Sequence, residues 1–455
     1  MKKAGFCAVA GSGMSALAQV LKAKGWEVFG TDRSFDQGKE IKIKQALQES
    51  GIVICPQDGS MLDNDLDVLY TSTAVESTIP DIKRALDLGV EIKKRSDLLA
   101  EIFASYPQGI AIGGTSGKST LTAMIGYVLD KAGLLPSVIN GAVMQNYKDK
   151  SGLPNVILND GKICVIEADE SDGSIAKYTP YISVVNNISL DHKTIEELKI
   201  LFGDFVKKAT LGAVINLDCP HASQLISLNK NILTFSISNP QADFYFHDIK
   251  AISGGSVYVF QNQTYTLPLI GNFNIANVAA AVAACSYFGV DAKKSCEILE
   301  TFAGTKRRLE ILGQENSITI IDDFAHNPDK VAASMSALKN YEGRLLIMFQ
   351  PHGFAPMRLM GKEIMDSFKQ YMSQDDILMV PEIYFSGGTV NRDISSQDLV
   401  NYITQSGKQA LYFPNRESLE QHIQQIMRPK DRIVLMGARD NTITDMGYRL
   451  LEKCK

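Results

Sequence analysis

The chain has 455 residues, of which 45% are hydrophobic and 21% are charged, and its net charge is −5. This length predicts about two to four domains, and the composition is typical of a soluble globular protein. The acidic balance excludes a global basic field that would attract nucleic acid. No apolar run reaches about 18 residues, so no membrane span is predicted.

The cysteines and the first residues predict a cytoplasmic protein. The seven cysteines are an odd number and lie scattered through apolar runs, without a Cys-x-x-Cys motif. They read as reduced thiols of a protein core. The apolar run after Met1 is short and meets a Gly-Ser-Gly turn, so it predicts a first β-strand and not a signal peptide.

Strand-like and helical runs alternate along the chain, which predicts an α/β protein with parallel sheets. The first hundred residues contain expected strands at 6–10, 27–30, 52–55 and 68–71 and expected helices at 14–24 and 41–49. A second unit has expected strands at 109–112, 162–168, 182–187 and 213–216 and a helix at 121–131; a third has strands at 318–322, 345–349, 377–380 and 432–436. We therefore expect three domains, covering residues 1–105, 106–304 and 305–455.

A glycine-rich turn follows the first expected strand. Residues 11–16 read Gly-Ser-Gly-Met-Ser-Ala, and Asp32 ends the second strand. This pattern matches the dinucleotide-binding fingerprint, in which glycines let the backbone approach a diphosphate. The diphosphate can belong to NAD or to a UDP-sugar, so an NAD-dependent oxidoreductase remains an alternative at this point.

A second glycine-rich turn lies between the expected strand at 109–112 and the helix at 121–131. Residues 113–120 read Gly-Gly-Thr-Ser-Gly-Lys-Ser-Thr. Backbone N–H groups in such a turn, together with the helix N-terminus, hold phosphate. Lys118 can reach the outer phosphates, and the Ser119 hydroxyl can bind Mg²⁺. The turn predicts binding of a nucleoside triphosphate, and a P-loop ATPase without ligase activity is a further alternative.

Acidic and amide side chains follow the next apolar strands. Residues 167–172 read Glu-Ala-Asp-Glu-Ser-Asp at a strand end, where carboxylates face the ligand crevice and suit Mg²⁺. Residues 186–188 read Asn-Asn-Ile and are followed by Asp191 and His192, a candidate metal ligand. Asn274 and Asn277 would share one helix face and could bind an adenine or ribose edge.

These segments together resemble the Mur ligase family, cytoplasmic enzymes that add amino acids to peptidoglycan precursors. Thr71-Ser72-Thr73, Arg95, the Arg-Arg-Leu-Glu segment at 307–310 and the Asp-Asp-Phe-Ala-His-Asn-Pro segment at 322–328 add to the resemblance, which spans essentially the whole chain. It implies a Rossmann-like UDP-binding domain, a central P-loop ATPase domain and a C-terminal Rossmann-like domain that binds the amino acid.

The resemblance also implies roles for individual residues. The UDP-sugar would contact Gly11, Ser12, Gly13, Met14, Ser15, Asp32, Thr71, Ser72, Thr73 and Arg95. ATP would contact Gly114, Thr115, Ser116, Gly117, Lys118, Ser119, Thr120, Asn274, Asn277, Arg308 and Asp323. Mg²⁺ would be held by Ser119, Glu167 and His192, the amine would lie near His326, His352 and Arg358, and the catalytic set would be Lys118, Glu167, His192, Arg308, Asp323 and His326. Phe202 stands near the position of a carbamylated lysine in several relatives, so none is assigned; Lys207 and Lys208 are expected on a helix surface.

The implied reaction is ATP-dependent amide formation through an acyl phosphate on UDP-N-acetylmuramate, with L-alanine as the favoured amine. Residues 351–358 read Pro-His-Gly-Phe-Ala-Pro-Met-Arg; they keep His352 and Arg358 but lose the other two arginines of the alanine-adding pattern Pro-His-Arg-Tyr-Thr-Arg-Thr-Arg. They partly resemble murein peptide ligase, which attaches a tripeptide to the same sugar, so that activity is an alternative. The expected partners are a UDP-sugar and a small amino acid or short peptide, without nucleic acid or membrane, in a monomer or homodimer.

Overall fold

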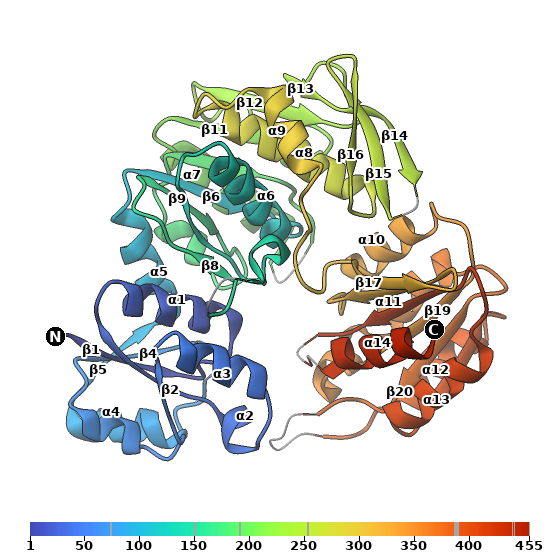
Figure 1. Cartoon of the computed structure of the whole chain (residues 1–455), viewed down its shortest axis with the longest axis horizontal. Coiled ribbons are helices and arrows are strands. Elements are labelled where there is room, and N and C mark those ends of the chain that lie inside the picture. Colours follow the sequence, from blue (N-terminus) through green and yellow to red (C-terminus); the bar gives the residue numbers. More distant parts are fainter. Residues whose placement is uncertain are drawn as a thin grey trace. The chain divides into compact units, whose positions relative to one another are not determined.

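The computed structural model describes residues 1–72, 75–149, 152–190, 193–252, 254–385, 391–438, 440 and 442–454. The chain divides into two compact units. The first contains Met1–Asp248, Tyr258–Leu267 and Phe273–Thr305, and the second contains Ile249–Val257, Pro268–Asn272 and Lys306–Lys455. Each unit is α/β (Figure 1). No helix in the described ranges is both long and apolar enough to cross a membrane.

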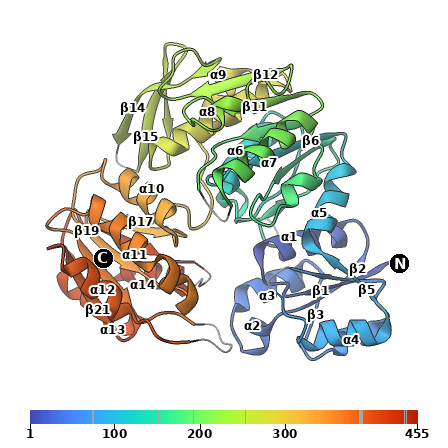
Figure 2. The same cartoon turned by 180° about the vertical axis from the view of Figure 1, so that it is seen from behind.

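The first unit begins with a five-stranded parallel sheet in the order β3-β2-β1-β4-β5. Its strands are β1 (Lys3–Cys7), β2 (Glu27–Thr31), β3 (Val53–Cys55), β4 (Val68–Thr71) and β5 (Glu91–Lys94). Its helices are α1 (Ser12–Ala23), α2 (Arg33–Asp36), α3 (Ile41–Glu49), α4 (Pro80–Leu88) and α5 (Arg95–Ala104), with the 3-10 helix η1 (Ser60–Asn64). Helices α1 and α5 cover one face, and α4 with η1 covers the other (Figures 1 and 2).

The central sheet of the first unit has the order β13-β12-β11-β10-β6-β9-β7-β8, and its pairs are parallel except for β7 with β8. Its strands are β6 (Gln108–Gly113), β7 (Ser137–Ile139), β8 (Val156–Ile157), β9 (Ile163–Glu167), β10 (Ile182–Val185), β11 (Gly212–Asn216), β12 (Ile232–Ser236) and β13 (Phe244–Tyr245). The associated helices are α6 (Lys118–Lys131), α7 (Ile195–Lys208), α8 (Asn272–Ser286) and α9 (Ala292–Leu299), with η2 (Gln145–Tyr147), η3 (Ser174–Lys177) and η4 (Ser223–Leu225). A three-stranded sheet of β14 (His247–Ile252), β15 (Gly255–Phe260) and β16 (Gln263–Leu267) lies between β13 and α8 in the chain.

The second unit is built on a six-stranded sheet in the order β17-β18-β22-β19-β20-β21, in which only β17 is antiparallel to its neighbour. The strands are β17 (Glu310–Glu315), β18 (Ile318–Asp323), β19 (Leu345–Phe349), β20 (Ile377–Pro381), β21 (Gln409–Phe413) and β22 (Arg432–Met436). Helices α10 (Pro328–Leu338), α11 (Phe354–Tyr371) and α12 (Ser396–Thr404) cover one face, and α13 (Arg416–Ile426) and α14 (Thr442–Lys453) cover the other.

The first and central sheets share a continuous apolar core. Leu98 and Phe103 of α5 belong to the same buried cluster as Cys164 of β9 and Tyr178. The rings of Phe103 and Tyr178 meet edge to face, with centroids 5.6 Å apart. Burial of this apolar surface favours the association of the two sheets, so the first two predicted domains pack as one compact unit.

Most of the expected strands are present, with one correction near the N-terminus. The strand expected at 6–10 ends at Cys7, because Ala8 has φ +65 and the chain turns there toward α1. Elements α4, β5 and α5 were not predicted. Strand β5 reads Glu-Ile-Lys-Lys and has no apolar run that would reveal it, because edge strands often carry charged residues. The α/β class and the parallel sheets are confirmed.

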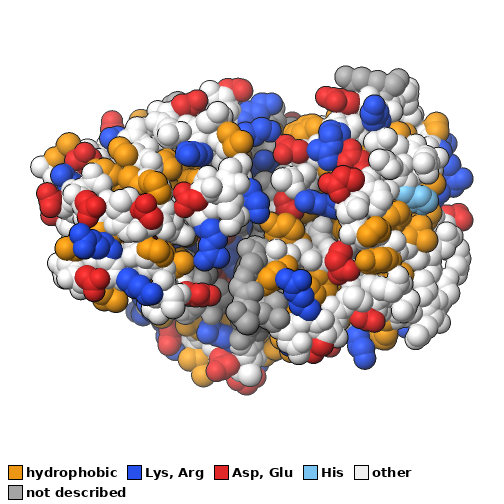
Figure 3. All heavy atoms as spheres, turned by 90° about the horizontal axis from the view of Figure 1, so that it is seen from below, with side chains coloured by type: hydrophobic (Ala, Val, Ile, Leu, Met, Phe, Trp, Pro, Cys, Tyr) orange, Lys and Arg blue, Asp and Glu red, His pale blue; other side chains and the backbone are white. Residues whose placement is uncertain are grey.

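The surface carries charges of both signs. Lys and Arg side chains are interspersed with Asp and Glu over the face shown in Figure 3. All seven cysteines are free, and five of them are buried, as expected for reduced core thiols.

Candidate active site at the phosphate loop

The loop between β6 and α6 has a backbone that requires glycine at two positions. Gly114 has φ +148 and Gly117 has φ +83, conformations that side chains with a Cβ rarely adopt. A Cβ on Gly117 would also lie 2.6 Å from Nδ2 of Asn186. The loop ends at the N-terminus of α6, whose exposed N–H groups favour an anion. The strand–turn–helix context that the sequence predicts for this motif is therefore present.

The ammonium group of Lys118 is held in place by hydrogen bonds to two oxygen atoms of the protein. Its Nζ donates to the Gly114 carbonyl at 2.7 Å and to Oε2 of Glu170 at 2.8 Å. The Glu170 side chain is only 4% exposed. Burial raises the pKa of the Glu170 carboxyl, and the Lys118 ammonium opposes this effect. A lysine placed in this way can exchange its carboxylate partner for the phosphates of a nucleotide.

The side chains of Ser119 and Glu167 are two candidate oxygen ligands that lie in contact near the carboxyl ends of the central strands. The Ser119 hydroxyl donates to Oε2 of Glu167 at 3.0 Å. The backbone N–H of Gly141 donates to Oε1 of the same carboxylate at 2.5 Å, and a Cβ on Gly141 would lie 2.7 Å from that oxygen. A hydroxyl and a carboxylate beside a phosphate-binding loop fit Mg²⁺, which prefers oxygen ligands.

The remainder of the predicted metal site is not described. His192, predicted as a second metal ligand and catalytic residue, lies outside the described residues. Among the residues that are described, no three His, Cys, Asp or Glu side chains cluster as a metal site. Mg²⁺ binding therefore stays a prediction that rests on Ser119 and Glu167.

Asp169 adds a second carboxylate close to the lysine. Its side chain accepts hydrogen bonds from the N–H and hydroxyl of Ser171, at 3.0 and 2.8 Å. Burial alone would raise the pKa of Asp169, but the Lys118 ammonium and the Ser171 hydrogen bonds outweigh it, so the pKa is lowered. Asp169 is consequently charged at neutral pH and adds negative potential around Lys118.

Asparagine side chains form hydrogen bonds to the phosphate loop. Oδ1 of Asn187 accepts from the Ser116 N–H at 2.9 Å and from the Thr115 hydroxyl at 2.9 Å. Asn186 donates to the Ser116 carbonyl at 3.2 Å and to Oδ1 of Asn277 at 2.9 Å. These bonds fix the loop before a nucleotide arrives, which lowers the entropy cost of binding.

The predicted asparagine pair is present on α8. Asn277 donates to Oδ1 of Asn274 at 3.2 Å, so the two side chains do share a helix face. Both residues are buried, and Asn277 also supports the phosphate loop through Asn186. The predicted adenine or ribose contact stays a prediction, as does a nucleotide contact of Thr120, which is buried on α6.

The diphosphate turn leads from β1 into α1. Met14 and Ser15 are buried at the start of α1. The Asp32 carboxylate accepts from the Ala10 N–H at 3.0 Å and from the Ser34 N–H at 2.9 Å, so it ties the turn to the N-terminus of α2. Gly11, Ser12, Gly13, Asp32, Thr71 and Ser72 are described residues of this first sheet and its loops, whereas Thr73 lies outside the described residues.

Arg95 connects the diphosphate turn to the acidic segment. A Cβ on Gly13 would lie 3.0 Å from Cδ and Nη1 of Arg95, so the arginine lies against the turn. Its Nη2 is 3.5 Å from Oδ2 of Asp172. The side chains of Arg95 and Asp172 are 26% and 22% exposed. Arg95 therefore lies where a bound diphosphate could reach it, which its position in the sequence alone does not establish.

In the second unit the two adjacent arginines have different environments. Arg307 is 4% exposed, and its Nε donates to Oδ1 of Asp322 at 3.1 Å. Arg308 is less buried, and both guanidinium groups lie over the Phe324 ring, 5.3 Å from its centroid for Arg307 and 5.2 Å for Arg308. Burial raises the pKa of Asp323, which accepts from the Ser334 hydroxyl and lies close enough to Arg308 for that charge to lower the pKa in part. Arg307 is thus committed to a buried ion pair in the fold, and the phosphate contact of Arg308 stays a prediction.

Of the predicted amine-binding residues, His326 and His352 follow β18 and β19, and Arg358 lies on α11. Nδ1 of His326 is 2.8 Å from the Phe324 carbonyl. The rings of His352 and Tyr384 lie with centroids 5.4 Å apart. Arg358 on α11 donates from Nε to Oδ1 of Asp393 at 2.8 Å. All three residues are present in one unit, and their contact with an amine stays a prediction.

Gly353 explains one departure from the alanine-adding pattern. It is the residue before α11 and has φ +76, where glycine is favoured over arginine. The next positions start the helix: Phe354 and Met357 are buried, and Pro356 lies in the first turn, where proline is tolerated. The altered residues therefore shape the start of α11.

Phe202, Lys207 and Lys208 lie as expected on α7. Phe202 is fully buried, and a Cβ on Gly113 would lie 2.8 Å from its ring. Lys207 pairs with Asp204 at 3.2 Å on the helix surface, and Lys208 is also exposed. The position near which relatives carry a carbamylated lysine thus belongs to the apolar core.

Several residues of this site were given no individual role from the sequence. They are Glu170, Asn186 and Asn187, which contact the phosphate loop or its lysine, and Asn140, Gly141 and Asn155, which follow β7 or precede β8. The strand ends at 167 and 185 are visible signals for the first three, because side chains at carboxyl ends of parallel strands converge. The last three lie in a segment without a readable pattern.

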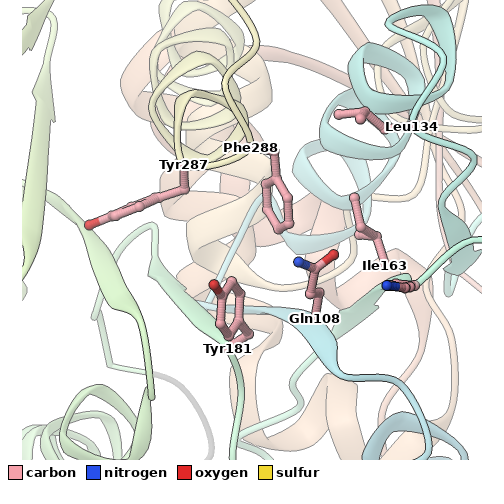
Figure 4. A pocket seen from close by; sticks show the side chains of 7 residues that line it. Gln108, Leu134, Ile163, Tyr181, Tyr287 and Phe288 are labelled. Carbon is pink, nitrogen blue, oxygen red and sulfur yellow. The ribbon is translucent and has the colours of Figure 1, made fainter.

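A pocket of about 390 Å³ lies at the amino ends of strands β6 and β9 of the central sheet (Figure 4). Gln108 and Ile163 begin strands β6 and β9, and Phe288 follows α8. The Tyr287 side chain points away toward the neighbouring strand and donates to the Asn231 carbonyl at 2.9 Å. No predicted site residue lines this pocket, because the phosphate loop lies at the carboxyl ends of the strands.

Comparison with known proteins covers nearly the whole chain. The sequence model of the Mur ligase family catalytic domain matches residues 3–107, that of the Mur ligase middle domain matches residues 112–285, and that of the Mur ligase glutamate ligase domain matches residues 307–439. These matches agree with the three-domain Mur ligase architecture.

Relatives and solved structures agree with these matches. The chain is 32% identical to UDP-N-acetylmuramate–L-alanine ligase of Carboxydothermus hydrogenoformans, over 98% of this chain and 96% of that protein. It is 34% identical to the ligase of that name from Desulforapulum autotrophicum, over 98% and 97%. The structure of UDP-N-acetylmuramate–alanine ligase from Thermotoga maritima shares the fold, with a TM-score of 0.82 at 24% identity over 100% and 99% of the two chains. A murein peptide ligase from Psychrobacter arcticus gives a TM-score of 0.71 at 21% identity, over 100% and 99%. The chain belongs to the Mur ligase family.

Proposed function

We propose that this protein joins L-alanine to the carboxylate of UDP-N-acetylmuramate, with conversion of ATP to ADP and phosphate, in the synthesis of peptidoglycan precursors. The observation that carries the proposal is the convergence of Lys118, Ser119 and Glu167 on one phosphate loop in a chain that aligns end to end with alanine-adding ligases. We place the enzyme in the cytoplasm, where ATP and UDP-sugars are made.

The proposed chemistry has two steps. The substrate carboxylate attacks the γ-phosphorus of ATP, and ADP leaves, which gives an acyl phosphate. The amine of alanine then attacks the acyl carbon, phosphate leaves, and a proton is lost as the amide forms. Lys118 lies 2.7 Å from the loop carbonyl of Gly114, in position to neutralise charge on the transferred phosphoryl group.

The metal fits the residues present. Ser119 and Glu167 would hold Mg²⁺, which would supply charge neutralisation at the phosphates when bound. Gly141 keeps the Glu167 carboxylate in place through its N–H. His192 is proposed as the further ligand.

The identity of the amine is the finer part of the proposal. L-alanine is favoured because relatives that align over the whole chain at 31% to 34% identity carry that activity in their names. The binding residues proposed are His326, His352 and Arg358. The Asp393 carboxylate already pairs with Arg358, so the α-carboxylate of the amino acid would have to share or displace that partner.

The test is amine-dependent phosphate release from ATP, Mg²⁺ and UDP-N-acetylmuramate, with the product identified by mass. L-alanine, glycine, L-serine and the tripeptide L-Ala-γ-D-Glu-meso-diaminopimelate are supplied separately. Release that L-alanine stimulates most, with a product of the matching mass, supports the proposal. Stimulation only by the tripeptide assigns the protein to murein peptide recycling. Nucleotide binding without release for any amine contradicts a ligase of either kind.

A further inference from the structure

We infer that Asn155 is a positioning residue: with Asn140 it forms a buried link that sets the diphosphate turn of the first sheet against the phosphate loop of the central sheet. The inference rests on the proposed function for the ligands at the two ends of this link. Asn155 itself is 2% exposed, so it is not offered as a ligand-contacting residue.

One end of the link is the diphosphate turn. Nδ2 of Asn155 donates to the Ser12 carbonyl at 2.8 Å and to the Ser15 hydroxyl oxygen at 3.1 Å. Oδ1 of Asn155 accepts from Nε2 of Gln19 at 3.1 Å. The amide group of Asn155 thus holds the helix side of the turn that would carry the UDP diphosphate, because both its donor and its acceptor atoms have partners on α1.

The other end of the link is the phosphate loop. The carbonyl of Asn155 accepts from the backbone N–H of Asn140 at 2.9 Å, which extends the antiparallel β7–β8 pair by one bond. Nδ2 of Asn140 donates to the Ser119 carbonyl at 3.1 Å. The N–H of the next residue, Gly141, holds Glu167. The residues that adjoin the β7–β8 pair therefore contact the diphosphate turn, the loop serine and the proposed metal-binding carboxylate.

This connection matters because the proposed reaction joins atoms bound at the two ends. For the reaction, a carboxylate oxygen of the UDP-sugar must lie about 3 to 3.5 Å from the γ-phosphorus of ATP. A misplacement of about 1 Å can lower a rate about a hundredfold without loss of binding. Three hydrogen bonds of the link are buried, those of Asn155 with Ser15 and Gln19 and that of Asn140 with the Ser119 carbonyl. Buried hydrogen bonds are costly to break, so they make the link stiff.

The first test separates positioning from binding with Asn155→Ala. We expect kcat to fall about 10- to 100-fold, while the dissociation constants of ADP and of UDP-N-acetylmuramate each stay within about threefold, at one site per chain. The matched control is Asn159→Ala. Asn159 is on the same segment and its amide also holds a backbone carbonyl, that of Pro136 at 2.8 Å, but within the central sheet. It should keep kcat within about twofold.

A second variant guards against misfolding of the first. Asn155→Asp keeps the volume and the acceptor for Gln19 but places an oxygen against the Ser12 carbonyl, so it should lower kcat with the same unchanged affinities. If kcat fell in proportion to a loss of ligand-binding sites per chain, part of the protein would be unfolded. Asn155 would then serve stability alone, and the inference would be overturned. Unchanged kcat in a folded variant would also overturn the inference.

Hydrogen exchange tests the link without ligase activity. In the wild-type protein, a non-hydrolysable ATP analogue with Mg²⁺ should slow amide exchange in the peptide covering residues 12–19 at least about twofold. In Asn155→Ala this protection should be absent. No protection in the wild type, or equal protection in both proteins, overturns the inference. If the wild-type protein forms no amide product, the proposed function is contradicted. The hydrogen-exchange measurement then still tests whether Asn155 links the two turns.

Discussion

At the level of single residues, Lys118 shows how the site prepares for a nucleotide. Its ammonium already lies between the Gly114 carbonyl and the Glu170 carboxylate, so the charge is directed toward the loop. Glu170 is buried, and the favourable partner for its negative charge is this lysine. The pair keeps the lysine ordered, and an incoming phosphate offers the ammonium a stronger set of acceptors.

Lys118→Ala should therefore abolish turnover while the fold persists. We expect kcat to fall by about three orders of magnitude or more, because a charge opposite the transferred phosphoryl group is lost. Phosphate release and thermal unfolding are the measurements. Lys131→Ala, at the other end of the same helix, should keep full activity, since that side chain lies over the Tyr127 ring. Wild-type rates in Lys118→Ala would refute the assignment of the loop.

At the level of elements, a buried carboxylate fixes the strands of the second unit. Asp376 is 2% exposed and accepts from the N–H groups of Leu345 and Ser373, at 2.8 and 2.6 Å, and from Lys339 Nζ at 3.1 Å. Burial alone would raise the pKa of Asp376, but these hydrogen bonds and the lysine outweigh it, so the pKa lies below 3.8. The ionised form is therefore the one that stabilises β19 and its neighbours.

Asp376→Asn should lower the free energy of unfolding by about 2 kcal/mol at neutral pH, because an amide cannot accept from all three donors. A lowered folded-state pKa gives stability that is present above 3.8 and is lost as the pH falls through that pKa. The difference between the variant and the wild type should hence shrink between about pH 5 and pH 3. Urea-induced unfolding of both proteins measures it. Asp375→Asn, at an exposed neighbour, should change little; an equal loss there would contradict the account.

At the level of the whole molecule, polar contacts around the shared core join the segments of the first sheet to those of the central sheet. Arg95 lies against Gly13 and pairs with Asp172, and Lys177 donates to the Ser96 hydroxyl at 3.0 Å. These contacts join the diphosphate turn to the segment that carries Glu167. A UDP-sugar bound at the turn would compete with Asp172 for Arg95.

Arg95→Ala should raise the dissociation constant of UDP-N-acetylmuramate about tenfold or more, because an arginine–phosphate hydrogen bond is lost. The affinity for an ATP analogue should stay within about threefold, since the phosphate loop keeps its own contacts. Calorimetry with each ligand measures both. Arg84→Ala removes an exposed pair between α4 and Asp63 of η1, on the other face of the first sheet, and should leave both affinities unchanged. Unaltered affinity for the UDP-sugar would make Arg95 a structural ion pair only.

The sequence by itself determined the α/β class, most of the strands and the phosphate-binding loop, because glycine turns, strand periodicity and helix starts depend on neighbours in the chain. The pairing of Ser119 with Glu167 came from the resemblance to the Mur ligase family and not from a local pattern. Only the tertiary structure decided that Arg307 is committed to Asp322, that Glu170 holds Lys118, and that Asn155 reaches Ser12. Those contacts join segments up to 143 residues apart, and their geometry depends on how the sheets pack, which local sequence patterns do not encode.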